Sequence, residues 1–432
     1  MTFHLNFFAG ELARLFGLSA GSANQLLISR LVAVLLGTLT IPVTVLAARE
    51  IYRSNRVALI AGTFAAITPI FVWDAHFATS DMGLLLWTAL AFYLATVAAN
   101  RPSLKIYVLG GLVVGLAIAT KFNGALVGTS FIAASVIGAA RGRVSWQVAT
   151  RLLIIAGVLS LVGFGLASPY SIEHLGETVE AFAFETRHVS GGHFGFDLDA
   201  VGWQYTKGIY QLAAAFPFSF GFALYAAVLA GLVAAIRVSS WRQTLLLLAF
   251  PAAYMAATTS WIFVPLRYYM PIFPMLLIAA AVGLDRLIGG EGTRKRVGMT
   301  ALGLVVAYTL VFTVTSTWRF TEDTRVTAAR WLEDELPAQS HLVYLQPRFQ
   351  ISYMPDPDRP DVQTRRMGVQ GIRAARSFAS TAAGDGLLVT SGLTYHRYYR
   401  QGRPEWQGIW DAVRKRSGEL RTRSYVRHVV PQ

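Results

Sequence analysis

The amino-acid sequence predicts an α-helical polytopic membrane protein with about ten transmembrane helices and a small C-terminal α/β domain on the outer face. Three observations predict this fold class. Hydrophobic residues fill 54% of the 432 positions and charged residues only 14%, whereas soluble domains carry about 25% charged residues. Apolar segments long enough to cross a bilayer recur between residues 22 and 317. Polar periodicity returns after residue 318.

The first segment, residues 1–21, is predicted to be amphipathic and to lie at the membrane interface. Apolar side chains such as Leu5 and Phe8 alternate there with Glu11 and Arg14, a pattern that suits a helix in the plane of the interface. An ordinary helix packed against the bundle explains the same pattern equally well.

The transmembrane domain is predicted to cover residues 22–317. Its ten spans run approximately over residues 25–47, 57–73, 81–99, 106–120, 124–140, 148–167, 216–236, 244–260, 268–287 and 297–317. The fourth span is short and contains Gly110, Gly111 and Gly115. Small residues let helices approach closely, so we expect this span to be buried among its neighbours.

The basic residues between the spans predict the orientation, because Lys and Arg in short loops favour the cytoplasm. One side of the membrane collects most of them: Arg49, Arg53, Arg56, Arg101, Lys105, Arg141, Arg143, Arg151, Arg237, Arg242, Arg286, Arg294, Lys295 and Arg296. The other side collects Arg14, Arg30, Lys121, Arg187, Lys207 and Arg267. We therefore expect the N-terminus, the turn at 71–80, the loop at 168–215, the turn at 261–267 and the tail to face outward.

Composition narrows the classes of function further. The net charge of +14 would suit a nucleic-acid-binding protein, but much of it falls in loops that topology already requires to be basic. No nucleic-acid partner is therefore expected. The chain has no cysteine, which excludes disulfides and thiolate metal sites. Arg outnumbers Lys, and Ala and Gly are abundant, which indicates a bacterial origin and hence the cytoplasmic membrane of a bacterium.

The tail, residues 318–432, is predicted to be an extracytoplasmic α/β domain. Helix-like and strand-like runs alternate along it, as in small α/β folds. Helices are expected at 327–336, 371–380 and 406–416, and strands at 341–345, 386–390 and 424–430.

The first outer turn carries candidate chemistry, since residues 73–81 include Asp74, His76 and Asp81. A carboxylate at a membrane boundary is costly to desolvate, so it usually caps a helix, pairs with a cation or lines a polar cavity. Ser80 or Asp81 has the right chemistry to cap the following helix. Asp74 and His76 suit an interfacial loop and a functional site equally well.

Two outer helix ends each carry a cation, Lys121 and Arg267. Such a cation can hold a lipid phosphate or extend to ordinary head groups. Alone, each is best interpreted as an interfacial anchor. Together with Asp81 on the same side, they describe a cavity suited to an anionic lipid and a carboxylate base.

The outer loop at 168–215 mixes carboxylates with His188 and His193, and it also contains Lys207. Carboxylate and imidazole ligands can bind a divalent cation, but no fixed ligand spacing is present. Glycines at 191 and 192 suit a mobile loop that folds over a substrate, and a plain polar connector is the alternative.

Taken in order, these outward features resemble the multispanning GT-C glycosyltransferases. The resemblance rests on short motifs at residues 76–81, 120–124 and 267–271, on the histidine-containing loop, and on residues 323–325, 329–332, 389–391 and 395–398 of the tail. It covers nearly the whole chain. Within the superfamily, the resemblance is to glycosyltransferase families 39 and 83, the branch that holds the protein O-mannosyltransferases and the lipid A aminoarabinose transferase.

The resemblance implies inverting transfer of a sugar from a polyprenyl-phosphate-linked donor to a hydroxyl of a protein, lipid or glycan at the outer face of the plasma membrane. A carboxylate takes the hydroxyl proton, while Arg, Lys or a divalent ion stabilises the departing phosphate. The implied roles are Asp81 and Asp74 as catalytic residues, Lys121, Arg267, Tyr268, Lys207 and His76 as substrate- and phosphate-binding residues, and His188 and His193 as optional metal ligands.

The chain departs from this group in one respect. Members normally begin with one further span and a first outer loop that carries the acidic base. We therefore expect the sequence to be truncated, with residues 1–21 the remnant of that loop and the usual base upstream of Met1. The alternatives are a noncatalytic lipid-carrier-binding member of the same fold and a secondary transporter, in which charged residues lie near the bilayer midplane.

Overall fold

The computed structural model describes residues 10–11, 22–191, 208–259, 261, 265–318, 324–336, 338–346, 359–368 and 386–390. Contacts within the chain divide it into two compact units. The helical unit comprises Met1–Ser190 and Lys207–Thr317, and the tail unit comprises Gly191–Thr206 and Trp318–Gln432. Each is described by itself.

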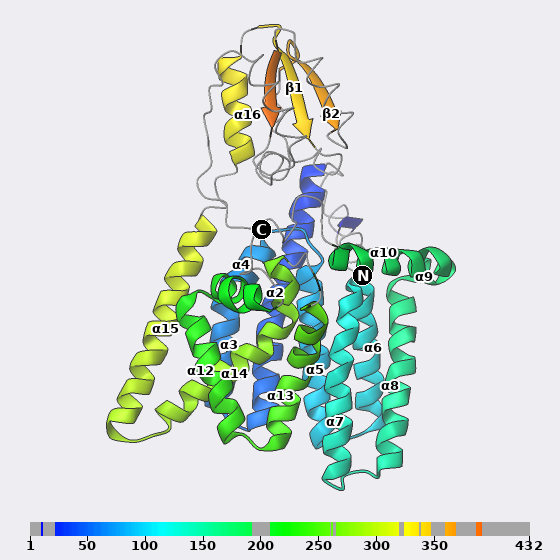
Figure 1. The fold of residues 1–432 in the computed structure, drawn as a ribbon, viewed down its shortest axis with the longest axis vertical. Helices are drawn as coiled ribbons and strands as arrows, with labels where there is room; N and C mark the ends of the chain where they lie inside the picture. The colour runs from blue at the N-terminus through cyan, green and yellow to red at the C-terminus, as the bar shows by residue number, and fades with distance from the viewer. Residues whose placement is uncertain are drawn as a thin grey trace. The chain divides into compact units, whose positions relative to one another are not determined.

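The helical unit is built from helices that run roughly side by side (Figure 1). They are α2 (Ser22–Tyr52), α3 (Asn55–Ile67), α4 (Pro69–Ala75), α5 (Asp81–Asn100), α6 (Leu104–Thr120), η1 (Phe122–Val127), α7 (Gly128–Ala140), α8 (Trp146–Ala167), α9 (Pro169–Glu173), α10 (Leu175–Gly191), η4 (Gln211–Ala215), α11 (Phe216–Phe220), α12 (Phe222–Val238), α13 (Trp241–Thr258), η5 (Leu266–Ile272), α14 (Phe273–Ile288) and α15 (Gly292–Trp318). Each of the ten predicted spans falls on one or more of these helices.

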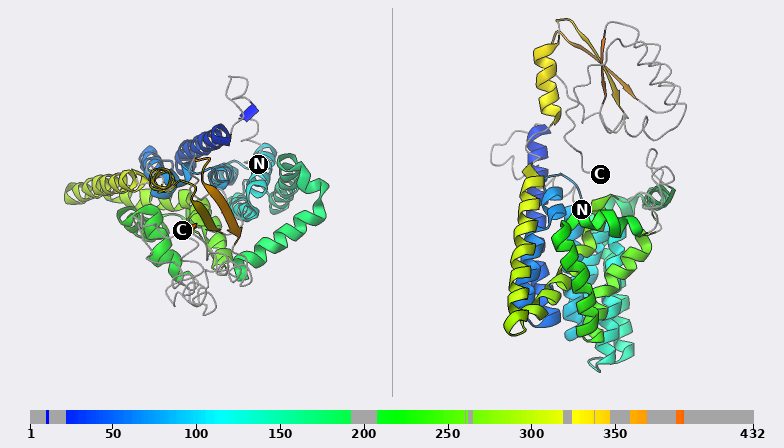
Figure 2. Two further views of the ribbon diagram at one scale, coloured as in Figure 1. Left: turned by 90° about the horizontal axis from the view of Figure 1, so that it is seen from above. Right: turned by 60° about the vertical axis from the view of Figure 1, so that its left-hand side comes forward.

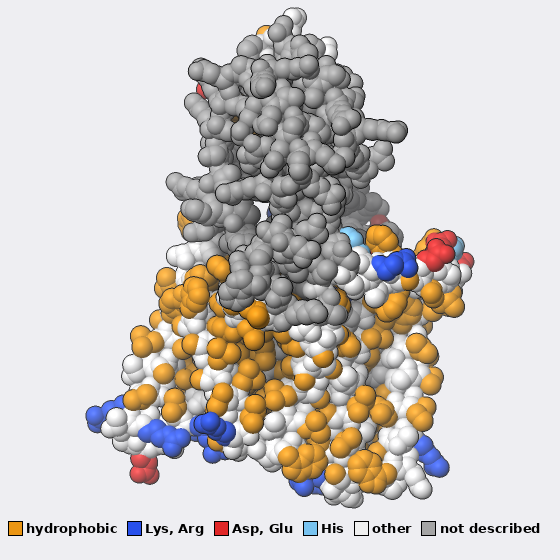
Figure 3. Space-filling view, viewed as in Figure 1, with side chains coloured by type: hydrophobic (Ala, Val, Ile, Leu, Met, Phe, Trp, Pro, Cys, Tyr) orange, Lys and Arg blue, Asp and Glu red, His pale blue; other side chains and the backbone are white. Residues whose placement is uncertain are grey.

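Among the described residues, six helices are long and apolar enough to cross a membrane, and eight spans result if each of two bent helix pairs counts as one. Helix α6 is shorter, with 17 residues. The fold class is therefore confirmed, while the number of ten spans stays a prediction. Large apolar side chains face outward on these helices, such as Leu161 with 68% and Leu304 with 66% of their surface exposed. Figure 3 shows these side chains over the middle of the helical unit and most of its Lys and Arg side chains at one end.

Two of the predicted spans are broken. Helices α3 and α4 meet at a bend of 49°, where Pro69 opens α4 and cannot continue the hydrogen bonding of α3. Helices α11 and α12 meet at 119°, with Gly221 between them at φ 75. A residue with a side chain rarely adopts this left-handed conformation. The predictions of continuous helices at 57–73 and 216–236 were wrong at these points, because an apolar run does not reveal a turn between two equally apolar helices.

The loop predicted at 168–215 is helical at its start. Helices α9 and α10 lie across the ends of α6 and α8 (Figures 1 and 2). Leu175, Val179 and Phe182 repeat on one face of α10 and are 51–59% exposed. Phe182 also packs edge-on against Phe122 of η1, with ring centroids 5.0 Å apart. This surface has the pattern of a helix lying in a membrane interface.

Helix α6 is packed closely against its neighbours, as its glycines predict. A Cβ atom on Gly111 or Gly115 would overlap a backbone carbonyl of α8, and one on Gly163 of α8 would overlap the carbonyl of Leu112. The two backbones therefore touch, which only residues without a side chain permit at these positions.

We predict that Gly163→Leu lowers the free energy of unfolding by about 1–3 kcal/mol, the usual cost of overpacking. Gly157→Leu is the matched control, because Gly157 lies on the same helix and a Cβ atom there would meet no other atom within 4 Å. Thermal unfolding of both variants in detergent measures the effect. Equal midpoints for the two variants would contradict the close contact between α6 and α8.

The tail unit contains α16 (Thr324–Glu335) and three parallel strands, β1 (His341–Gln346), β2 (Gln363–Gly368) and β3 (Gly386–Thr390), in the order β2-β1-β3. The helix expected at 327–336 and the strands expected at 341–345 and 386–390 are present. Strand β2 was missed because its sequence, Gln-Thr-Arg-Arg-Met-Gly, lacks an apolar alternation. Charged side chains of this kind are common on edge strands. The elements expected at 371–380, 406–416 and 424–430 lie outside the described residues.

A small core and one ion pair organise the described part of the tail unit. Leu332, Leu342 and Val362 pack together. Arg359 donates to the carbonyl of Leu336 at 2.6 Å, just beyond the end of α16. The same guanidinium donates to both carboxylate oxygens of Asp361, at 3.0 and 2.5 Å. These hydrogen bonds lower the pKa of Asp361 to about 2 from its usual 3.8.

This pKa predicts how the tail unit responds to acid. A carboxyl whose pKa is lowered by folding contributes stability above its unfolded-state pKa and loses that contribution as the pH falls through its folded-state pKa. Asp361→Asn should therefore lower the thermal midpoint at pH 6, and the difference from the native chain should close between pH 4 and pH 2. Circular dichroism across this range measures it, with the exposed Asp334→Asn as control. A constant difference down to pH 2 would rule out this role of the Asp361 charge.

Candidate functional site

The centre of the candidate site is the carboxylate of Asp81, which is buried with 3% of the residue exposed. Lys121 donates to Oδ1 of Asp81, and Arg267 approaches Oδ2 with its Nε at 3.1 Å. An ionised carboxylate away from water requires such partners, because burying it unpaired is very costly. The structure thus brings together three residues that sequence reasoning assigned to one cavity.

Local structure explains how each of these side chains reaches the cluster. Asp81 opens α5, where a negative charge is stabilised by the helix dipole. Lys121 follows the last residue of α6 in extended backbone conformation, and Arg267 lies in η5 just after Pro265. Ser80 is the N-cap residue of α5, as one alternative expected, but its side chain makes no capping hydrogen bond. Asp81 sits inside the helix and pairs with the two cations instead.

Tyr268 completes the cationic side of the cluster. Its ring lies 4.2 Å from Nζ of Lys121 and 5.9 Å from Cζ of Arg267, measured to the ring centroid. Both cations therefore contact the π-face of one aromatic ring. This contact holds the two positive groups close together, despite their mutual repulsion, on either side of the Asp81 carboxylate.

A buried tyrosine that sequence reasoning missed supports this arrangement. Tyr254 of α13 is fully buried and donates a hydrogen bond to the backbone carbonyl of Tyr268 at 2.5 Å. Asn123 donates to the Tyr254 hydroxyl at 2.6 Å. Oδ1 of Asn123 is itself buried without a partner among the described residues. One signal in the sequence indicates that Asn123 belongs to the site, namely its place two residues after Lys121. Tyr254 has no such signal, because the apolar sequence around it is typical of a lipid-facing or core helix.

Asp74 lies at the end of α4 with 4% of its surface exposed. Its Oδ2 accepts a hydrogen bond from Thr79 at 2.9 Å. The charges of Asp81, Arg267 and Lys121 are all close enough to act on it. With both carboxylates ionised, the charges of Asp74 and Asp81 balance those of Lys121 and Arg267. A bound phosphate would then add net negative charge, and its oxygens would accept hydrogen bonds from the two partly exposed cations.

The remaining predicted site residues lie elsewhere or outside the described residues. His76 is exposed, and its Nδ1 is 2.7 Å from the carbonyl of Val72. His188 lies on α10 and stacks on Phe184 with ring centroids 5.6 Å apart. His193 and Lys207 are outside the described residues. Within the described part of the chain, no three His, Asp or Glu residues gather as metal ligands do, so the metal site at His188 and His193 stays a prediction.

Comparison with protein families gives one match. The family described as dolichyl-phosphate-mannose-protein mannosyltransferase matches residues 11–168. This region contains Asp74, Asp81 and Lys121, and it ends before Arg267. A comparison with curated protein sequences finds no match.

Solved structures extend the similarity beyond residue 168. ArnT from Cupriavidus metallidurans bound to undecaprenyl phosphate superposes with a TM-score of 0.51 at 18% identity, over 91% of this chain and 83% of that one. The Archaeoglobus fulgidus oligosaccharyltransferase, in its complex with Zn and sulfate, gives a TM-score of 0.51 at 16% identity, over 79% of this chain and 51% of that one. The protein has the GT-C fold. The apo forms of the same two relatives give TM-scores of 0.52, and the chain spans about half the length of the archaeal enzyme.

We predict that Asp81→Asn destabilises the protein by roughly 1–3 kcal/mol. This range lies between the values for exposed and for fully buried ion pairs, because the carboxylate is buried while 26% of the Lys121 and 39% of the Arg267 side chain is exposed. Asp285→Asn, which removes the partner of the half-exposed Arg56, is the control and should cost less. Thermal unfolding in detergent compares them, and a larger loss in Asp285→Asn would contradict the central role of Asp81.

Proposed function

We propose that the protein transfers a sugar, with inversion, from a polyprenyl-phosphate-linked donor to an acceptor hydroxyl on a protein, lipid or glycan. The reaction takes place at the outer face of a bacterial cytoplasmic membrane. The observation that carries this proposal is the cluster in which Asp81 pairs with Lys121 and Arg267 beside the ring of Tyr268.

This cluster has the donors that a lipid phosphate needs. A lysine ammonium has three N–H donors and an arginine guanidinium five. Asp81 engages only part of this capacity, and both cations remain partly exposed while Asp81 is buried. Charge-assisted hydrogen bonds from Arg and Lys to phosphate oxygens are among the strongest in proteins. In the reaction they would stabilise the negative charge that develops on the departing phosphate.

The two carboxylates then take different roles. Both carboxylate oxygens of Asp81 are engaged, Oδ1 by Lys121 and Oδ2 by Arg267, so its role is to position these two cations. Asp74 has no ion pair among the described contacts and is the better proton acceptor. The acceptor oxygen attacks the anomeric carbon, the bond from that carbon to the phosphate oxygen breaks with its electrons on the phosphate, and the hydroxyl proton passes to Asp74.

The comparisons support this reaction class over the alternatives. The relatives include a family described as a mannosyltransferase, an oligosaccharyltransferase, and ArnT in complex with undecaprenyl phosphate. A carrier lipid with a single phosphate suits a site whose phosphate-binding groups are one Lys and one Arg. The same relatives give no support to a secondary transporter. A noncatalytic lipid-carrier-binding protein of the same fold differs from an enzyme only in the transfer step, so the experiment must measure binding and transfer separately.

We predict that Lys121→Gln and Arg267→Gln each weaken binding of undecaprenyl phosphate about tenfold or more, the effect of losing a charge-assisted hydrogen bond of roughly 1.5–3 kcal/mol. Lys105→Gln is the matched control, because Lys105 lies in the first turn of the same helix that Lys121 follows, at its opposite end. Native mass spectrometry of the purified protein measures the binding. Equal losses in all three variants would overturn the assignment of the phosphate site.

Transfer is tested in proteoliposomes with labelled polyprenyl-phosphate hexoses as donors. Asp74→Asn should bind undecaprenyl phosphate as the native chain does and lose at least 100-fold in transfer, about the lower contribution of general acid–base catalysis. Asp334→Asn, on the exposed face of α16, is the control and should retain transfer. Full transfer by Asp74→Asn would exclude Asp74 as the base, and tight lipid binding without any transfer by the native chain would favour the noncatalytic alternative.

A further inference from the structure

At the end of α5 opposite Asp81, helix ends surround a second polar site. Asn100 ends α5, about 28 Å along the helix from Asp81 at 1.5 Å per residue. A pocket of about 430 Å³ opens there. Its polar lining is Glu50, Arg53, Asn100, Arg101, Arg141, Arg143, Ser240, Arg242 and Gln243. Five arginines therefore face one glutamate in this pocket, which we call the arginine pocket.

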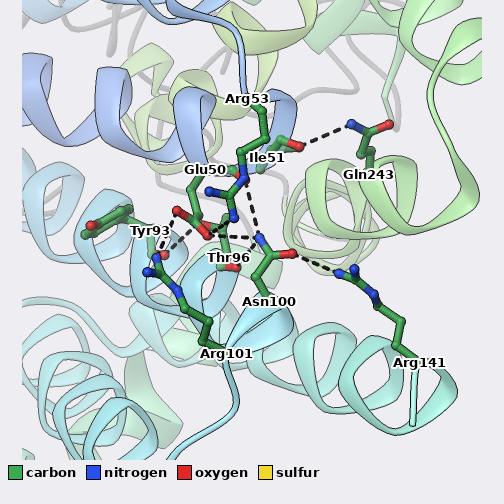
Figure 4. Close-up of polar contacts among 9 residues, drawn as sticks. All are labelled: Glu50, Ile51, Arg53, Tyr93, Thr96, Asn100, Arg101, Arg141 and Gln243. Carbon is green, nitrogen blue, oxygen red and sulfur yellow. Dashed lines mark hydrogen bonds and ion pairs between the residues drawn. The ribbon is translucent and has the colours of Figure 1, made fainter. Parts of the chain in front are cut away.

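The arginine pocket is held together by a hydrogen-bond network (Figure 4). Glu50, whose side chain is 10% exposed, pairs with Arg53 at 2.8 Å and with Arg101 at 3.1 Å. Asn100 donates to Oε1 of Glu50 at 3.0 Å and accepts from Arg141 at 3.0 Å. One carboxylate and one amide thus orient three guanidinium groups from three separate segments of the chain.

Positive charge and donors remain in excess after these bonds. Within the described residues, neither Arg143 nor Arg242 has a carboxylate partner. Nε of Arg242 is buried and has no hydrogen-bond partner in the described part of the chain. A buried N–H without an acceptor is costly. Arg242 lines the arginine pocket, so an anion bound there would offer acceptors to this arginine. One guanidinium group can donate two hydrogen bonds to two oxygens of the same phosphate, because the spacing of its N–H groups matches that of the oxygens.

The backbone conformation of Arg53 also supports a functional role for its side chain. Arg53 follows α2 with φ 54, the left-handed conformation in which glycine is usual after a helix end. A non-glycine residue there stores strain, which persists where the side chain has another role. The Arg53 side chain is 64% exposed yet bonded to Glu50, so its cation stays at the mouth of the arginine pocket.

Topology alone does not account for this arrangement. Lys and Arg in loops bias the orientation of a membrane protein wherever they lie, and they need neither a shared pocket nor a glutamate and an asparagine to orient them. We propose that the arginine pocket binds the phosphate group of an anionic phospholipid in the predicted cytoplasmic leaflet. Basic pockets between transmembrane helices on the cytoplasmic side are known to bind such head groups.

An apolar surface next to the pocket favours a lipid over free phosphate. A neighbouring hollow of about 470 Å³ shares Glu50 and Arg53 with the arginine pocket and is also lined by Leu46. Leu39, Leu35 and Leu31 follow one another at intervals of four residues on the same side of α2 and are 44–58% exposed. An acyl chain can follow this row of leucines into the bilayer while its phosphate stays with the arginines.

Native mass spectrometry of the full chain in detergent tests the proposal, with dioleoylphosphatidylglycerol, dioleoylphosphatidylcholine and inorganic phosphate as probes. We expect one phosphatidylglycerol to be retained more tightly than phosphatidylcholine. Arg101→Gln and Arg141→Gln should each weaken its binding about tenfold, the loss of one charge-assisted hydrogen bond. Arg237→Gln removes an exposed arginine at the end of α12, outside the arginine pocket, and should leave binding unchanged.

Two results would overturn the proposal. Equal weakening by Arg237→Gln would mean that only the overall charge of this face attracts the lipid. Competition by inorganic phosphate at concentrations like those of the lipid would mean that the pocket takes a free anion. Because the readout is lipid binding at this end of the helices, it is independent of sugar transfer.

A further variant separates a structural role from binding. Arg53→Gly removes one cation and also relieves the left-handed strain. We expect its thermal stability to equal or exceed that of the native chain while phosphatidylglycerol binding falls. Loss of stability with unchanged binding would show that Arg53 serves the helix end and not the lipid.

Discussion

The structure of the candidate site depends on the cost of burying the Asp81 carboxylate. A charge away from water must be matched by opposite charge and hydrogen bonds. The matching cations come from the end of α6 and from η5, so the ion pairs fix these segments against the start of α5. Both cations keep part of their surface exposed. The interaction that satisfies one buried acid therefore also presents two positive groups to an incoming anion.

The site lies where the regular helices are interrupted. Lys121 stands between α6 and η1, Arg267 lies in η5, and Asp74 lies near the end of the short α4 after the break at Pro69. In a membrane, irregular backbone survives only where protein or a polar cavity satisfies its hydrogen bonds. Tyr254 does this for the carbonyl of Tyr268. The same polar groups that satisfy the interrupted backbone thus build the surroundings of the proposed reaction.

Both ends of the helical unit use one carboxylate to hold two cations. Asp81 does so for Lys121 and Arg267, and Glu50 does so for Arg53 and Arg101. In each case the two cations have more N–H donors than the one carboxylate accepts, which leaves donors for a phosphate group. The two sites differ in their surroundings, since the first lies beside Tyr268, Tyr254 and Asn123, whereas the second opens beside exposed leucines of α2. This difference suits a substrate that must react at one end and a lipid that stays bound at the other.

The sequence by itself determined the helical membrane fold, the approximate place of the long apolar helices, and the polar residues at helix ends that form the site. These follow from hydropathy and from the high cost of charge in lipid, which act on each segment separately. Only the tertiary structure decided which of these residues meet, because Asp81, Lys121 and Arg267 are brought together by helix packing and not by spacing. It alone revealed the partnership of Tyr254, the bends at Pro69 and Gly221, the helical start of the loop at 168–215 and the edge strand β2. Each of these depends on a partner distant in sequence or on a turn between equally apolar segments, which a local pattern does not contain.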